Sequence, residues 1–380
     1  MIGMVCIVQQ ANSFCSAPWV GMYYHSNSVS PCCTTKTQNM SPNEYLASDW
    51  LKSLKQEFID GKKPDVCKAC WVKEDQGLKS IRTGFRKRAI DPNKTTTHLE
   101  IRESNLCNFA CRMCNPTDSV KIEREFEINP ELQKFYLPNK SSDMTEENWN
   151  QIMKVAIGLD SINITGGEPM LMKRYYDLLD HLIDHGRNEN IILKIFTNCS
   201  VYNPIFIEKM LKFKNVQLRM SIDAVGKTAE YQRYGTDWET VRANIFKFAE
   251  LPIRMGIHST ITAYSILDTS SLADLFIELE SYENLKATLV NFDAHVSRTP
   301  IALDYANLNV DLRLRAVREI DAAVGKLTST LFTAYVRELL AIKKQLLERR
   351  DCNFALFVSL TKALDRIRNQ SFEEVFRYNI

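Results

Sequence analysis

The chain has 380 residues, in which 48 lysines and arginines nearly balance 46 aspartates and glutamates. This balance argues against nucleic-acid binding through bulk charge, and 45% hydrophobic with 25% charged residues is typical of a globular protein rather than a disordered or fibrous one. No apolar run approaches the ~20 residues that span a bilayer, so no membrane partner is expected. The apolar residues 1–8 predict a strand, because they lack the basic leader of a secretory signal, and a cytoplasmic protein is expected.

Residues 1–85 are irregular and rich in cysteine, and they are expected to form a small domain of their own. Two short pieces, around Trp19–Tyr24 and Val29–Pro31, predict a hairpin. A helix is expected over residues 43–59, because Ser41 is a suitable N-cap and a proline follows it at the first helical position.

After a basic and polar linker at residues 86–96, an alternation of strands and helices begins. The predicted strands are His98–Glu103, Ser161–Thr165, Ile191–Thr197, Val216–Ile222, Ile253–Thr262 and Thr288–Val296. The predicted helices between them are Thr145–Gly158, Arg174–His185, Pro204–Phe213, Trp238–Glu250 and Ser271–Tyr282. Six strands separated by helices predict an α/β fold with parallel strands and right-handed crossovers.

An open doubly wound sheet would satisfy this pattern, but we predict a partial (β/α)6 barrel of the TIM type over residues 97–300. The remaining residues, 301–380, are charged and periodic, and they predict a helical C-terminal region.

The chain contains 11 cysteines, and eight of them lie at short spacings within residues 15–114. In a protein without an export signal these should be reduced thiols, so their clustering indicates metal or redox chemistry. The isolated Cys6, Cys199 and Cys352 are expected to be buried for packing.

The sharpest motif is Cys107-Asn-Phe-Ala-Cys111-Arg-Met-Cys114, directly after the first strand of the barrel. Three thiolates at this spacing can bind three irons of a [4Fe–4S] cubane and leave the fourth iron open. A zinc site would need a fourth ligand, and the nearest histidine, His98, precedes the strand.

A second motif, Ile164-Thr165-Gly166-Gly167-Glu168-Pro169, follows at the end of the second barrel strand. With both motifs, the chain resembles the radical S-adenosylmethionine (radical SAM) enzymes. In that family the GGEP strand end approaches the amino group of SAM, and glycines allow such a close backbone approach. The resemblance implies that SAM chelates the open iron, that one electron cleaves it to methionine and a 5′-deoxyadenosyl radical, and that this radical abstracts hydrogen from a substrate.

Weaker matches extend the expected cofactor site along the strand ends. Asn198, in a Thr-Asn segment, would lie near the cofactor, and the segment from Ser221 to Asp223 would lie near the ribose. Arg233 would pair with the SAM carboxylate, since an arginine fork suits a carboxylate, although a surface salt bridge is an equal alternative. Met113 stands where many family members have an aromatic residue against the adenine. The full expected set is Met113, Gly166, Gly167, Glu168, Pro169, Asn198, Ser221, Asp223 and Arg233.

The N-terminal cysteines resemble the auxiliary-cluster regions called SPASM and twitch domains, although in many relatives that region follows the barrel. The resemblance implies a second [4Fe–4S] cluster on Cys15, Cys32, Cys67 and Cys70, with Cys33 as a substitute for Cys32. A structural zinc ion is the main alternative, because four cysteines with one C-x2-C pair also suit zinc.

Family members with auxiliary clusters often modify peptides or proteins, so a peptide or protein substrate is the first hypothesis, with a flavodoxin- or ferredoxin-type reductant. A small molecule or nucleotide is the second, and an iron–sulfur protein without turnover is the third. No general base is identifiable. Glu103, Asp223, Tyr231 and His258 could face the pocket, but each type is more often a structural polar residue.

Overall fold

The structure is a computed structural model that describes residues 12–25, 27–75, 79–91, 93–94, 96–136, 143–282, 289–296, 300–348 and 352–380, with the backbone alone for 289–296. The strand predicted at residues 1–8 and the packing role predicted for Cys6 lie outside these ranges. No helix in the described ranges is long and apolar enough to cross a lipid bilayer.

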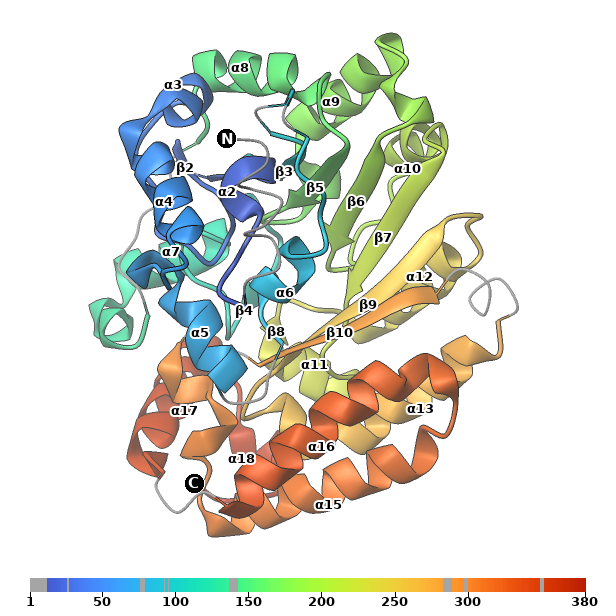
Figure 1. Cartoon of the computed structure of the whole chain (residues 1–380). Coiled ribbons are helices and arrows are strands. Elements are labelled where there is room, and N and C mark those ends of the chain that lie inside the picture. Colours follow the sequence, from blue (N-terminus) through green and yellow to red (C-terminus); the bar gives the residue numbers. More distant parts are fainter. Residues whose placement is uncertain are drawn as a thin grey trace.

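An eight-stranded sheet forms the centre of the molecule (Figure 1). Its spatial order is β10-β9-β7-β6-β5-β3-β1-β2. The strands are β1 (Gly21–His25), β2 (Ser28–Ser30), β3 (His98–Arg102), β5 (Ser161–Thr165), β6 (Ile192–Thr197), β7 (Asn215–Ser221), β9 (Arg254–Ile261) and β10 (Leu289–Val296). All six predicted barrel strands are therefore confirmed, with ends that differ by one residue at most.

The described strands of this sheet run parallel to their neighbours, except that β2 is antiparallel to β1. From β1 to β10 the parallel strands lie side by side in chain order, so the sheet is wound in one direction. This order is that of a partial barrel and differs from a doubly wound sheet, in which the strand order reverses. The predicted fold class is confirmed.

The N-terminal segment joins the barrel sheet through a parallel pairing that the sequence analysis does not predict. β1 pairs with β3, with Gly21 opposite His98 and His25 opposite Arg102. The predicted hairpin of β1 and β2 exists, but it continues the barrel sheet. Its strand β1 pairs with β3, so the segments before and after the predicted linker at residues 86–96 share one sheet. The division of the chain into domains therefore stays a prediction.

Helices connect the barrel strands where the sequence pattern predicts them. They are α8 (Glu146–Ala156), α9 (Lys173–Asp184), α10 (Pro204–Leu211), α12 (Trp238–Ala249) and α13 (Thr269–Glu280). In α8, Thr145 caps the first turn, and Trp149, Ile152 and Ala156 are buried at helical spacing. Such a stripe is what an amphipathic helix presents to a sheet.

The single helix predicted over residues 43–59 is two helices, α3 (Pro42–Ala47) and α4 (Asp49–Ile59). Ser41 caps α3 as predicted, through a reciprocal capping box with Glu44. Ser48 has an extended backbone, and its hydroxyl accepts a hydrogen bond from Leu51 N, so it starts a new helix.

The other N-terminal helices are short: α2 (Ala17–Val20), a 3-10 turn at Asp65–Cys67, α5 (Lys68–Asp75) and α6 (Ile81–Phe85). Around them lies a small hydrophobic core that is separate from the main one. Its buried members are Phe14, Cys15, Ala17, Val20, Cys32, Leu54, Phe58, Trp71 and Phe85. This separate core is what a small attached unit needs, although its strand β1 belongs to the barrel sheet.

The C-terminal region is helical, as predicted, with α15 (Val310–Lys326), α16 (Thr333–Glu348), α17 (Phe354–Arg368) and α18 (Phe372–Phe376). α15 packs against α13 and α16, and α18 packs against α11 (Gly226–Gln232) (Figure 1). Cys199 is buried, as expected, whereas the expected burial of Cys352 is wrong, because this residue lies exposed in the connection before α17.

Candidate cofactor site

The cysteine loop follows β3 and is fixed by a two-stranded antiparallel pair, β4 (Ala110–Cys111) and β8 (Arg233–Tyr234). This pairing sets Cys111 directly opposite Arg233. The thiols of Cys111 and Cys114 are hydrogen-bonded to each other, and Cys107 lies close enough to both for their charges to interact. The structure thus places the loop of the three predicted cysteines at the carboxyl end of the sheet, with thiols near one another but not arranged as a metal-binding group.

The electrostatic environment of the three thiols is uneven. Burial raises the pKa of Cys107 to about 12, and the hydrogen bond to Cys111 together with burial raises the pKa of Cys114. The same hydrogen bond, aided by Arg233, lowers the pKa of Cys111. Binding of a metal cluster must therefore displace protons from at least two of these thiols.

The GGEP turn packs against the start of the cysteine loop. Gly167 has a left-handed backbone, with φ of +41°, and a Cβ there would lie 2.1 Å from the carbonyl oxygen of Leu106. The next residue, Glu168, donates its backbone N–H to that same carbonyl at 2.9 Å. Position 167 therefore requires glycine because the GGEP turn lies so close to the cysteine loop, whether or not a cofactor is bound. Contact of the turn with SAM stays a prediction.

We therefore expect Gly167→Ala to destabilise the protein without any cofactor present. The methyl group would meet backbone atoms, which cannot move aside as a side-chain end can, and the left-handed conformation would add strain. The expected loss of unfolding free energy is about 3 kcal/mol, measured by chemical denaturation of the metal-free chain.

The matched control is Gly186→Ala. Gly186 also has a left-handed backbone, with φ of +64°, but a Cβ there would meet nothing within 4 Å. It should therefore lose about 1–2 kcal/mol from the backbone conformation alone. Equal losses in the two variants would show that the contact with Leu106 is unimportant.

Glu168 is buried and links the ends of two strands. Its carboxylate accepts hydrogen bonds from the Thr197 hydroxyl at 2.9 Å, from Asn198 N at 2.7 Å and from Met170 N at 3.3 Å. Burial raises its pKa to about 7, and these donors act against that rise. Pro169 starts the single 3-10 turn Pro169–Leu171 that follows.

Asn198 connects the end of β6 to the cysteine loop. Its side-chain amide donates to Asn108 Oδ1 at 3.0 Å and lies 3.9 Å from the sulfur of Cys107. Asn108 in turn donates to the hydroxyl of Ser200 at 2.8 Å. The predicted placement of Asn198 beside the cysteine site therefore has a geometric basis in this network.

Asp223 and Arg233, which the sequence analysis treats separately, are partners in one buried ion pair. Arg233 donates through Nε and Nη2 to Asp223 Oδ2, each at 2.7 Å. Asp223 also accepts from Gln232 Nε2 and from Thr260 N. The exposed fractions of the two side chains are 12% for Arg233 and 1% for Asp223, so the alternative of a surface salt bridge is wrong. Arg233 Nη1 lies 4.0 Å from the sulfur of Cys111.

The remaining candidates have mixed placements. Met113 and Ser221 are half-buried, and Met113 packs against the main core. Glu103 pairs with Arg174 at 3.2 Å, and the hydroxyl of the buried Tyr231 donates to Asp365 at 2.7 Å. Glu103 and Tyr231 thus have structural partners, and no general base is assigned.

One functional candidate is missed by the sequence analysis. Arg112, between two of the cysteines, is completely buried and pairs with Asp365 of the C-terminal region. Arg112 carries the only charge in the cysteine loop, which is a signal in the sequence. Its partner Asp365 lies far along the chain, and no sequence signal points to it.

The four N-terminal cysteines line one cavity. Its walls include Cys15, Cys32, Cys67 and Cys70, together with Phe58 of α4 and Arg82 of α6. Cys33 is absent from this lining, and its thiol interacts with Glu100 on β3. In the described ranges, neither these cysteines nor those of the loop after β3 are arranged closely enough with other Cys, His, Asp or Glu side chains to hold a metal ion as they stand.

The fold and the cysteine loop together define an α/β protein of the partial-barrel type with a three-thiol site at the strand ends. Residues 103–269 match the family described as the radical SAM superfamily. The central segment of the chain is thus similar to that superfamily, and this similarity indicates an enzyme and implies a [4Fe–4S] cluster and SAM as cofactors.

Among curated proteins the chain is similar to enzymes named GTP 3',8-cyclase. It is 28% identical over 139 residues to one from Helicobacter pylori, covering 35% of this chain and 36% of the relative. It is 22% identical over 229 residues to one from Sulfurimonas denitrificans, covering 60% and 64%. The chain therefore spans less than two thirds of the length of these relatives.

Among solved structures, one similar fold is Streptococcus suis SuiB bound to the precursor peptide SuiA, at 17% identity and a TM-score of 0.41. It covers 72% of this chain and 64% of that one. Another is anSMEcpe with bound AdoMet and a peptide, at 16% identity and a TM-score of 0.38, covering 59% and 58%. These distant similarities carry no functional argument.

Proposed function

We propose that this protein is a radical SAM enzyme whose cluster is held by Cys107, Cys111 and Cys114. The observation that supports the proposal is the position of the loop in the matched segment, which holds the three thiols within electrostatic reach of one another at the carboxyl end of a parallel sheet. The donor set fits the group, because three thiols leave one iron for SAM. When bound, the cluster supplies the electron that cleaves SAM to methionine and a 5′-deoxyadenosyl radical.

The residues of the chain would orient the cofactor and exclude water. The GGEP turn and Asn198 hold the cysteine loop in place through Leu106 and Asn108. Arg233, oriented by Asp223, has Nη1 directed near Cys111 and offers a donor for a carboxylate. The carboxylate of Glu168 has a structural role, because it already accepts hydrogen bonds from three donors of the chain.

The cavity lined by Cys15, Cys32, Cys67 and Cys70 would hold a second [4Fe–4S] cluster, with structural zinc as the alternative. The lining supports Cys32 over Cys33 as the fourth ligand. A flavodoxin- or ferredoxin-type protein would supply the electron.

For the substrate, a peptide or protein is the first candidate, on the resemblance of the N-terminal cysteines to auxiliary-cluster regions. A nucleotide is the second candidate, and the similarity to enzymes named GTP 3',8-cyclase favours it.

The test begins with anaerobic reconstitution using iron and sulfide, followed by dithionite and SAM. Wild-type protein should form 5′-deoxyadenosine and methionine, measured by mass spectrometry. Iron-loaded protein that forms neither would overturn the proposal. Adding GTP, or co-expressing a candidate precursor peptide, then separates the substrate classes: a new nucleotide product favours the second candidate, and a mass change on the peptide favours the first.

A further inference from the structure

Arg112 is anchored through its backbone and through Nε and Nη2 of its guanidinium, while the buried Nη1 makes no hydrogen bond. Its backbone N–H donates to Gln232 O at 2.8 Å, and its carbonyl accepts from the hydroxyl of Tyr136 at 2.8 Å. Its guanidinium lies 3.6 Å from the ring centre of Tyr231 and donates through Nε to Tyr231 O at 2.9 Å. The side chain is fully buried. A charge so deeply buried is tolerated only with a partner.

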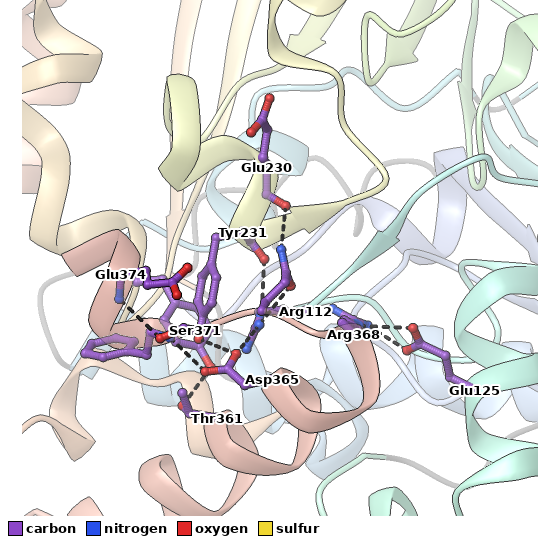
Figure 2. Close-up of polar contacts among 12 residues, drawn as sticks. Arg112, Glu125, Glu230, Tyr231, Thr361, Asp365, Arg368, Ser371 and Glu374 are labelled. Atoms are coloured by element: carbon purple, nitrogen blue, oxygen red, sulfur yellow. Dashed lines mark hydrogen bonds and ion pairs between the residues drawn. The ribbon is translucent and has the colours of Figure 1, made fainter. Parts of the chain in front are cut away.

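That partner comes from the C-terminal region, as Figure 2 shows. Arg112 Nη2 donates to Asp365 Oδ1 at 2.5 Å and to Gln370 Oε1 at 3.0 Å. The same Asp365 oxygen accepts from the hydroxyl of Tyr231, and the other oxygen accepts from Phe372 N at 2.8 Å. The carboxylate is therefore itself held rigidly, at the point where α17 turns into α18.

A second buried ion pair, with the charges reversed, lies three residues further on (Figure 2). Arg368 donates through Nε and Nη2 to the two carboxylate oxygens of Glu125, at 3.0 and 2.7 Å. Glu125 belongs to α7 (Val120–Ile128), the helix that follows the cysteine loop. The end of α17 thus contacts the loop itself and the helix behind it.

We propose that Arg112–Asp365 and Glu125–Arg368 form a C-terminal clamp that positions the cysteine loop for its cluster. The inference rests on the proposed function and makes Arg112 a positioning residue. Because loop geometry sets how the cluster and SAM meet, a small displacement of the loop should slow SAM cleavage strongly. Asp365 and Arg368, at the end of α17, then help to position the active site.

The clamp should also affect the reduction potential of the cluster, because Arg112 is the next residue in the chain after the ligand Cys111. With Asp365→Asn, an uncompensated positive charge remains on the residue next to Cys111, so the reduction potential should rise. With Arg112→Gln, an uncompensated negative charge remains on Asp365, still stabilised by Tyr231 and Phe372 N, so the potential should fall. The double variant should return toward the wild-type potential.

The experiment measures iron content, the midpoint potential of the cluster whose electron paramagnetic resonance signal responds to SAM, and 5′-deoxyadenosine formation. We expect each single variant to form 5′-deoxyadenosine about a hundredfold more slowly than wild type. Arg112→Lys keeps the charge without the fork, so it should be slow at a nearly wild-type potential. The matched control is Arg366→Gln on the same helix. Arg366 pairs with Glu131 at the surface, where 70% of the arginine side chain is exposed, so the variant should form 5′-deoxyadenosine within about twofold of the wild-type rate.

Single variants that shift the potential in the same direction, or not at all, would overturn the clamp. If wild-type protein binds no iron, the proposed function fails, and the clamp is then judged on the metal-free chain by hydrogen exchange. There Asp365→Asn should speed the exchange of amides in residues 107–114, and Arg366→Gln should not. Equal exchange in both variants would overturn the clamp independently of the proposed function.

Discussion

Replacing Cys107, Cys111 and Cys114 together with Ala should abolish the formation of 5′-deoxyadenosine from SAM. These thiols lie within electrostatic reach of one another in the loop after β3, and in the described ranges the other cysteine set lines a separate cavity. Without the three thiolates, nothing in this loop can hold a cluster with an open iron. The measurement is the yield of 5′-deoxyadenosine under dithionite, in anaerobic reconstituted protein.

The control for this experiment is Cys352→Ala, because Cys352 is exposed and belongs to neither cysteine set. It should cleave SAM at the wild-type rate. A triple variant that still cleaves SAM, with a circular dichroism spectrum like that of wild type, would show that the radical SAM chemistry is wrongly assigned.

The N-terminal cysteines should account for about half of the iron bound by each reconstituted chain. Two cubanes would give about eight irons per chain, so the triple variant should keep about four. Adding Cys67→Ala should remove these as well, because Cys67 lines the same cavity as Cys15, Cys32 and Cys70. It should also loosen the segment, since α4 contributes Phe58 to this cavity and ligation is coupled to local folding.

Metal analysis with Mössbauer spectra distinguishes the alternatives. About one zinc and no iron in the triple variant would establish structural zinc at this site. Cys33→Ala, next to Cys32 but outside the lining, is the matched control and should keep all the iron. If Cys33→Ala lost iron and Cys32→Ala did not, the choice of ligand would be reversed.

Local signals in the sequence were sufficient for most of the barrel. The six strands from β3 to β10 and the helices between them follow from hydrophobic periodicity and caps, which act over a few residues. The incorrect prediction of one helix through Ser48 also has a local cause. A helix-length pattern runs through it, but its hydroxyl caps Leu51 and starts a second helix.

The two cysteine sets were also identifiable in the sequence, because ligands from one short loop must be close in the chain. The three thiols of the loop lie within electrostatic reach of one another, and the four N-terminal cysteines line one cavity, while the metal site at each set stays a prediction. The sequence alone left open whether Cys32 or Cys33 is the fourth ligand, since the spacings of two adjacent residues to the other cysteines differ by only one residue. The direction of the side chain separates them.

The tertiary structure alone decided which distant segments meet. It added β1 to the barrel sheet, joined Asp223 to Arg233, and placed the Leu106 carbonyl where a side chain at position 167 would be. It also paired Arg112 with Asp365, 253 residues away. Periodicity and motif spacing report on neighbours along the chain, whereas a buried charge is stabilised by whichever opposite charge the packing brings to it.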